Sequence, residues 1–221
     1  MLTSWSGPVR DALEPAVLVD SETVHVGGKW KVEVQTVDIA GQRVKRDIVI
    51  HPGAVSVLVL NDRDEVLLIR QYRQALGMYL FETPAGLLDI TAENPLEAAQ
   101  RELAEEAGVK AARWETLVDF YNSPGGSSEA IRIYLGREIT ELPDGRIVTG
   151  EAEEMDLPCV WVPLEQAVDL VLGGDLGNPT TVVGVLAAWA WRMDPHRVLR
   201  NANASWSARE GLKSLGRLPS V

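Results

Sequence analysis

The feature that most constrains the fold is one helical segment, residues 94–108, with clear signals at both ends. Asn94 suits the cap, Pro95 the first helical position, and Glu97 the third position of a capping box. Gly108 supplies the stop. The spacing predicts a helix of about thirteen residues between these signals.

Two adjacent faces of this helix differ in chemistry. At 100° per residue, its apolar side chains fall within an arc of about 80°, which predicts a core-facing stripe of Leu96, Ala99, Leu103 and Ala107. The neighbouring arc of about 100° holds Glu102, Glu105 and Glu106. Their mutual repulsion raises their pKa values unless a cation lies among them. Hard oxygen ligands suit Mg²⁺ or Mn²⁺, whereas the simpler alternative is a solvated acidic face.

Strand-like segments fill most of the remaining chain. Between residues 22 and 50, three runs are separated by turn signals and predict a small antiparallel sheet. Two nearly continuous apolar runs, 54–60 and 65–73, flank the turn 61–64, which predicts a hairpin of central strands. Further strands are predicted at 114–121, 130–139 and 159–163.

Two more helices complete the α/β pattern. One is predicted over 164–172, and an apolar one starts at the Asn178-Pro179 cap and should be buried against the sheet. The result is a mixed β-sheet sandwiched by helices, plus an N-terminal antiparallel sheet. We expect an arm and sheet over 1–50, a main domain over 51–195, and a polar tail without clear periodicity over 196–221.

Composition excludes several classes of function. With 221 residues, 46% of them hydrophobic, the chain can bury a substantial core. Its formal net charge of −11 argues against sequence-independent binding to nucleic acid, which needs a basic footprint. No run approaches the roughly 18 apolar residues of a membrane span, and we expect neither export nor a membrane anchor. The single cysteine, Cys159, lies in an apolar run and is predicted to be an inert core thiol of a cytoplasmic protein.

The residues around the helix carry a resemblance to a known family. Segment 86–109 reads GLLDITAENPLEAAQRELAEEAGV. It resembles the signature box of the Nudix hydrolases: a glycine, a glutamate, then R-E-hydrophobic-x-E-E-x-G-hydrophobic. The last nine positions match without exception, but six residues rather than the usual five separate Gly86 from Glu93. The resemblance implies a Nudix-type α/β/α sandwich in which Arg101 and Glu93 form a salt bridge that holds the loop on the helix.

The same resemblance implies metal-dependent chemistry on a diphosphate. Glu102 and Glu106 would be ligands of Mg²⁺, with Mn²⁺ possible, and the carbonyl of Ala85 would be a ligand from the loop. Glu105 would be a catalytic residue oriented to the same cluster. Bound metal ions can bridge a diphosphate, neutralise its charge and activate a water for attack on phosphorus.

Segments outside the box point to the substrate. HPGAVSVLVL, LLIRQYR and FETPAGLL resemble the ADP-ribose and nucleotide-sugar pyrophosphatases of the family, a resemblance over roughly residues 20 to 190. It implies hydrolysis of ADP-ribose to AMP and ribose 5-phosphate. The alternatives are another nucleotide sugar or dinucleotide, or a domain that senses nucleotides without turnover. The complete set of glutamates argues against a sensor.

The resemblance also implies substrate contacts. Arg73 would reach the phosphates or terminal ribose and Glu82 the ribose or adenine, unless the two only form an ion pair. Arg46 would bind phosphate, and Trp30 would be a platform for adenine or a packing residue. Pro124 lies in a loop that is either a substrate loop or a plain turn. The expected substrate-binding residues are Trp30, Arg46, Arg73, Glu82, Leu87 and Pro124.

A general base is expected in a glycine-led acidic segment before the strand at 159–163. Glu151, Glu153 and Glu154 all lie there. Glu153 is the first choice as base and Glu154 a further metal ligand, with a solvated acidic loop as the alternative. Finally, the resemblance implies a homodimer with exchanged N-terminal strands, so that two chains complete each active site.

Overall fold

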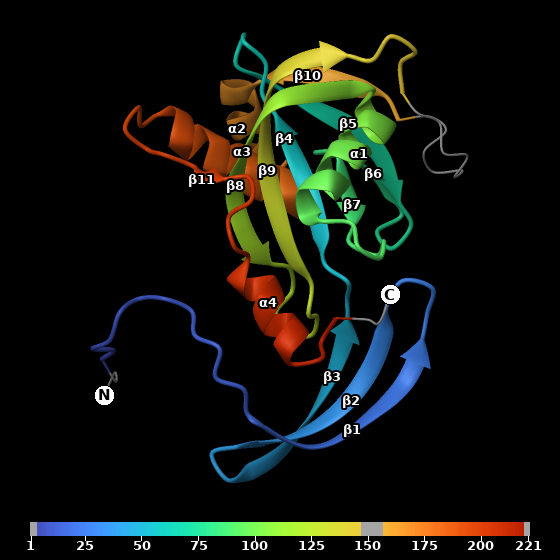
Figure 1. The fold of residues 1–221 in the computed structure, drawn as a ribbon, viewed down its shortest axis with the longest axis vertical. Coiled ribbons are helices and arrows are strands. Elements are labelled where there is room, and N and C mark those ends of the chain that lie inside the picture. Colours follow the sequence, from blue (N-terminus) through green and yellow to red (C-terminus); the bar gives the residue numbers. More distant parts are fainter. Residues whose placement is uncertain (1–3, 147–156, 219–221) are drawn as a thin grey trace.

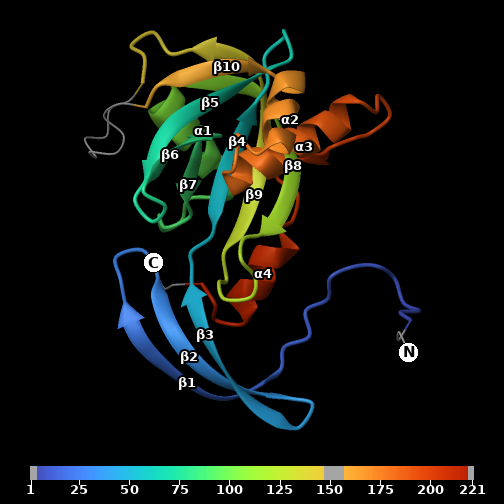
Figure 2. The ribbon, with the colours of Figure 1, turned by 180° about the vertical axis from the view of Figure 1, so that it is seen from behind.

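A computed structural model describes residues 4–146 and 157–218 of the chain (Figure 1). A central sheet separates two helical layers, and this confirms the predicted α/β/α sandwich. One layer holds α1 (Pro95–Ala107) and α4 (Ser207–Ser214). The other holds α2 (Leu164–Gly173) and α3 (Pro179–Arg192), which are seen clearly from behind (Figure 2). Among the described residues, no helix is long and apolar enough to cross a lipid bilayer.

The central sheet is mixed, as predicted. Its order is β11-β8-β9-β4-β7. The strands are β11 (Arg200–Asn201), β8 (Val109–Tyr121), β9 (Ala130–Glu141), β4 (Ala54–Val59) and β7 (Ala85–Leu87). The β4–β9 pair is parallel, whereas the other pairs are antiparallel. Strand β4 therefore lies between β9 and β7, with both of its edges paired.

A second sheet has the order β10-β5-β6, from β10 (Cys159–Pro163), β5 (Glu65–Arg73) and β6 (Met78–Glu82). The predicted hairpin between β4 and β5 is wrong, because after a single bridge between Leu60 and Val66 the two strands enter different sheets. Strand β4 has no free edge for β5. Both strands are nevertheless central in their own sheets, as the apolar runs predicted.

The predicted N-terminal antiparallel sheet is confirmed. It contains β1 (Val17–Val26), β2 (Lys31–Ile39) and β3 (Gln42–Ile50), in that order. Ala40 and Gly41, both at positive φ (53° and 79°), form the tight turn between β2 and β3. The sheet extends beyond the sandwich, and the chain passes from β3 directly into β4 (Figure 1).

Two apolar clusters fill the space on either side of β4. One includes Leu58 and Val185 and lies toward α2 and α3. The other includes Val57 and Leu103 and lies toward α1. Because consecutive β4 residues point to opposite faces, a strand that is apolar throughout fits a position between two helical layers.

The C-terminal segment is more ordered than the sequence indicated. It supplies β11 and α4, and Trp206 is buried in the same cluster as Leu103. The guanidinium of Arg132 lies 4.8 Å from the Trp206 ring and donates to the carbonyls of Ala204 and Ser205. These contacts hold α4 against the sheet.

The predicted burial of Cys159 is wrong, because its side chain is exposed. It lies on β10, which among the described residues is an edge strand paired with β5. Partial burial of the sulfur still raises the pKa of the thiol, so the thiolate is disfavoured.

His51 connects the N-terminal sheet to the sandwich. Its Nδ1 accepts a hydrogen bond from the Gly53 amide (3.1 Å), and its ring stacks on Trp30 with centroids 5.6 Å apart. Burial lowers the pKa of His51, although Glu129 nearby opposes that shift. The neutral ring is therefore the form that suits the folded state.

We expect this histidine to make the fold acid-sensitive. A histidine whose folded pKa lies below its unfolded value contributes stability that is present above about pH 6.5 and is lost as pH falls through the folded pKa. Between about pH 7.5 and about pH 5, the urea midpoint of His51→Gln should therefore fall less than that of wild type. His196→Gln, at an exposed position, is the matched control. Equal losses in all three proteins would contradict the assignment.

Candidate active site

Helix α1 forms where its terminal signals predict. The Asn94 side chain accepts from the amides of Leu96 and Glu97, both at 3.0 Å, and the Glu97 carboxylate accepts from the Asn94 amide at 3.1 Å. Gly108 ends the helix in the left-handed region, at φ 66°. Thirteen residues lie between these caps, which confirms the predicted helix.

Two of the three glutamates on α1 face the protein interior. Glu102 is 9% exposed and Glu106 only 4%, while Leu103 between them is fully buried. A solvated acidic face is therefore excluded for this pair. Two carboxylates on successive turns of one helix are held close together beside the core.

Gly86 lies directly against Glu102. A Cβ atom added to Gly86 would lie 1.9 Å from Glu102 Oε1 and 2.4 Å from Glu102 Cγ. Real atoms do not approach so closely, so any other residue here would displace the carboxylate. The glycine at the start of the box therefore allows the strand β7 to touch the helix glutamate.

Ala85 contributes backbone groups to the same place. Its amide donates to Glu106 Oε2 at 2.8 Å. The Val57 amide on β4 donates to the Pro84 carbonyl, so that carbonyl points toward β4. The amide of Ala85, the next residue, therefore points away from β4. In such a strand, one residue's amide and carbonyl point to the same side. The Ala85 carbonyl thus points to the side on which Glu106 lies.

Arg101 links the loop to the helix. It bonds both oxygens of Glu93, at 2.8 and 3.0 Å, which confirms the predicted salt bridge despite the longer loop. The loop reaches this position with Ala92 at positive φ, 66°. The same guanidinium donates to Glu102 (2.7 Å) and Glu105 (2.9 Å). The Glu93 carboxylate, with help from Glu102 and Glu105, raises the pKa of Arg101 above its ordinary value.

The donors at this site are oxygens, as Mg²⁺ or Mn²⁺ requires. Within the described residues, no three acidic, histidine or cysteine side chains are arranged to hold a metal ion. Instead, Glu102 and Glu106 supply two carboxylates and Ala85 a carbonyl, while Glu105 lies against Arg101. The remaining acidic candidates, Glu153 and Glu154, lie outside the described residues.

Arg73 and Glu82 were expected either to contact substrate or only to form an ion pair. The structure contains the ion pair. Arg73 donates to both oxygens of Glu82, at 2.8 and 2.5 Å. Glu82 is 1% exposed, whereas the Arg73 side chain is 40% exposed. Of the two, only Arg73 is accessible to a substrate in this structure.

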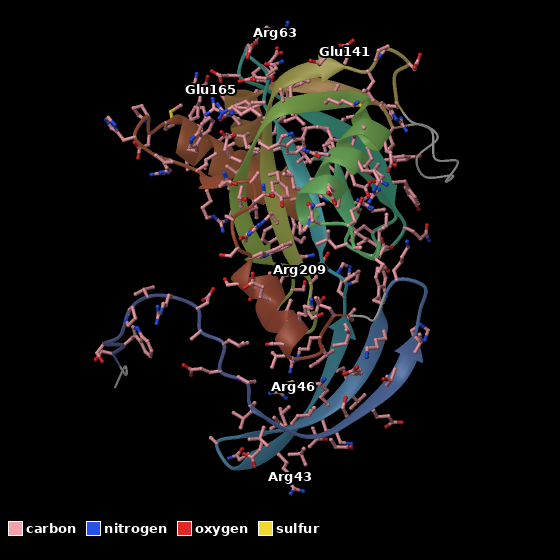
Figure 3. All side chains as sticks on the ribbon, viewed as in Figure 1. Arg43, Arg46, Arg63, Glu141, Glu165 and Arg209 are labelled. Carbon is pink, nitrogen blue, oxygen red and sulfur yellow. The ribbon has the colours of Figure 1, made fainter. Side chains whose placement is uncertain are left out.

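Two of the other expected substrate residues, Arg46 and Pro124, line a cavity that contains none of the helix glutamates. Exposed Arg46 and Pro124 line one cavity of about 570 Å³ between the N-terminal sheet, α4 and the loop after β8, and no α1 glutamate lines it. Arg46 lies on the N-terminal sheet, away from α1 (Figure 3). Trp30 stacks on His51, and Leu87 packs against the core. In one chain, Arg46 and Pro124 therefore line a cavity separate from Glu102, whereas Leu87 follows Gly86, the residue that lies against Glu102.

Comparison with known proteins agrees with the geometry around α1. The model of the family described as NUDIX domain matches residues 50–180. An ADP-ribose pyrophosphatase of Mycobacterium tuberculosis strain H37Rv is 38% identical over 173 residues, covering 78% of this chain and 82% of the relative. The chain belongs to the Nudix family.

Two further comparisons extend this assignment. An ADP-ribose pyrophosphatase of Bacillus subtilis strain 168 is 32% identical over 168 residues, which cover 76% of this chain and 89% of the relative. A crystal structure described as an ADP compounds hydrolase has a TM-score of 0.70 at 25% identity, covering 86% of this chain and 100% of its own.

Two contacts around the Nudix box had no signal in the sequence. Lys29 bonds Asp89 at 2.7 Å and so joins the β1–β2 turn to the loop of the box. Arg146 donates to the Glu105 carbonyl at 3.3 Å, near the end of α1. Both pairs join residues more than forty positions apart, so no local pattern could have indicated them.

We expect Gly86→Ala to damage the Nudix site while Gly28→Ala does not. The added methyl must displace the Glu102 carboxylate, whereas a Cβ at Gly28 meets nothing within 4 Å. Mn²⁺ binding, followed by electron paramagnetic resonance, should weaken by about 10- to 100-fold in Gly86→Ala, as when groups supporting a metal site are removed. Unchanged affinity in Gly86→Ala would show that Glu102 is not a ligand.

Proposed function

We propose that this protein hydrolyses the diphosphate of ADP-ribose to AMP and ribose 5-phosphate in an Mg²⁺-dependent reaction. The observation that carries the proposal is the buried pair Glu102 and Glu106, held against Gly86 and Ala85 on a rigid capped helix. The names of the two relatives and of the solved structure support ADP-ribose as substrate.

In this proposal Glu102, Glu106 and the Ala85 carbonyl hold the metal. Mg²⁺ is our first choice and Mn²⁺ also fits the oxygen donors. When bound, the metal supplies charge neutralisation of the diphosphate and activation of water. Arg101 keeps Glu102 oriented, since it bonds Glu102 and is itself fixed by Glu93.

Proton transfer falls to an acidic side chain. We assign Glu153 as the base that takes the proton of the attacking water as oxygen bonds to phosphorus and the bridging P–O bond breaks. Glu105 assists from its position on Arg101, and Glu154 is a further metal ligand. Glu151 is the alternative base in the same segment.

The substrate contacts complete the proposal. Arg73, oriented by buried Glu82, would bind the phosphates or the terminal ribose. Trp30 would stack on adenine, with Leu87 beside the diphosphate. Arg46 and Pro124, which share one cavity, would contact the distal part of the substrate. If these contacts fit another nucleotide sugar or dinucleotide better, the same glutamates would cleave that compound instead.

We further propose a homodimer with exchanged N-terminal strands, in the cytoplasm. All ten residues of β1 are exposed, including apolar Val17, Leu18, Val24 and Val26. An exposed apolar edge strand is a surface that a second copy could cover. Exchange would also bring Arg46 of one chain to the helix glutamates of another.

Removing one carboxylate should strongly lower turnover without unfolding the protein. We expect Glu106→Gln to lower kcat for ADP-ribose by about 10²- to 10³-fold, because several kcal/mol of transition-state stabilisation depend on the metal. AMP release in the presence of Mg²⁺ measures this decrease, and Glu141→Gln, at an exposed position, is the control.

Glu153→Gln tests the base in the same assay, and a near-normal rate would transfer that role to Glu151 or Glu154. A panel of nucleotide sugars and dinucleotides tests the substrate, and a preference for one of them would replace ADP-ribose.

Mixing two inactive variants tests whether two chains complete one site. If they do, Glu106→Gln and Arg46→Ala chains, unfolded and refolded together, should recover about a quarter of wild-type activity, because one site in each mixed dimer is intact. Glu106→Gln mixed with Glu102→Gln is the control, because each chain then lacks one helix glutamate and neither site of a mixed dimer is intact. Recovery in neither mixture would contradict the exchanged dimer.

A further inference from the structure

A second cavity, of about 470 Å³, lies beside the end of α3 and the start of β8. The segment after α3 returns to β8, with which β11 pairs (Figure 2). Four arginines line the cavity: Arg113, Arg137, Arg192 and Arg197. Two carboxylates line it, Glu115 and Asp194. This is a local excess of positive charge in a chain whose formal net charge is −11.

The ion pairs within the cavity leave this excess in place. One oxygen of Glu115 accepts from both Arg113 Nε (2.8 Å) and Arg137 Nη2 (2.6 Å). Two guanidinium groups therefore share one carboxylate. Arg197 is 3.4 Å from Asp194, a loose contact between half-exposed side chains.

The ion pair of Arg192 does not remove the excess of arginines over carboxylates. It donates two hydrogen bonds to Asp64, outside the cavity lining, at 2.9 and 2.8 Å. Even with Asp64 counted, three carboxylates face four arginines.

Arg137 is fixed at the base of the cluster. Its guanidinium lies 5.0 Å from the Trp191 ring, and its side chain is mostly buried. Within the described residues, Arg137 Nε is buried without a hydrogen-bond partner. The bond from Nη2 to Glu115 and the packing on Trp191 together hold the guanidinium in one orientation, and its Nε has no acceptor among the described residues.

Arg113 and Arg197 line the same cavity as Arg137, and Arg197 Nη1 also donates to the Ala190 carbonyl at 2.8 Å. Both side chains are about half exposed, and neither has more than one carboxylate partner among the described residues. Guanidinium groups match phosphate oxygens with paired hydrogen bonds. A cavity of this size is within the range for small molecules.

We propose that this cavity binds a phosphate group, as inorganic phosphate or as a small phosphate monoester, through Arg113, Arg137 and Arg197. None of the α1 glutamates lines it, so the site is separate from the proposed metal site. The phosphate supplies the negative charge that the two lining carboxylates do not.

Calorimetric titration of the full chain with inorganic phosphate, in EDTA, tests this site. EDTA excludes metal-mediated binding at the α1 glutamates. We expect saturable binding that weakens as salt rises. In Arg113→Gln/Arg197→Gln, phosphate affinity should fall at least tenfold, because two charged ligands are removed. Arg10→Gln/Arg43→Gln is the matched control, with the same loss of charge at exposed positions outside the cavity.

A second titration with AMP distinguishes the two sources of phosphate. AMP binding more tightly than inorganic phosphate, and weakened by the cavity variant but not by the control, assigns a phosphate monoester. Equal affinities assign the inorganic ion. The proposal is overturned if phosphate binding is not saturable, or if the cavity variant binds as wild type does. Neither result depends on hydrolysis of ADP-ribose, since no turnover is measured.

Discussion

The packing of Glu102 against Gly86, with Arg101 bonded to the same carboxylate, is the contact on which the site depends. A carboxylate that touches backbone on one side and a guanidinium on the other has little freedom. Burying it without such a partner would be costly, and Arg101 provides the compensating charge. Because Glu93 also bonds Arg101, the loop, the helix and the strand β7 are held together by one guanidinium.

This arrangement explains why the glutamates tolerate one another. Like charges on successive turns of a helix repel, and a helix without other contacts would lose stability from them. Here Arg101 offsets Glu105 and Glu102, while the Ala85 amide bonds Glu106. The pair that faces the interior is thereby kept in position, which is what a site for a divalent cation needs.

The parts of the fold predicted from sequence are those fixed by neighbours in the chain. Caps at Asn94 and Gly108 define α1, and turn residues such as Gly41 define the N-terminal sheet. The predictions were wrong where strand pairing between segments far apart in the sequence determines the structure. Strand β4 pairs with β9 and β7 and so leaves β5 to another sheet, and β10 is an edge strand that exposes Cys159. Helix α4 has only eight residues and no side-chain cap, so its place depends on the burial of Trp206.

The site divides in the same way. Local spacing was enough to place Glu102 and Glu106 side by side, because both lie on one helix. The surroundings of Arg73 and Arg46, in contrast, depend on strand pairing and on contacts between segments far apart in the sequence. Arg73 is held by Glu82 nine residues away across a hairpin, whereas Arg46 lies in a cavity shared with α4 and Pro124. The two buried carboxylates are therefore positioned by one helix and the loop before it, whereas Arg46 is positioned by the N-terminal sheet. The cavity that Arg46 lines contains no glutamate of α1, so a change at Arg46 leaves in place the bonds that hold Glu102 to Arg101 and Glu106 to the Ala85 amide.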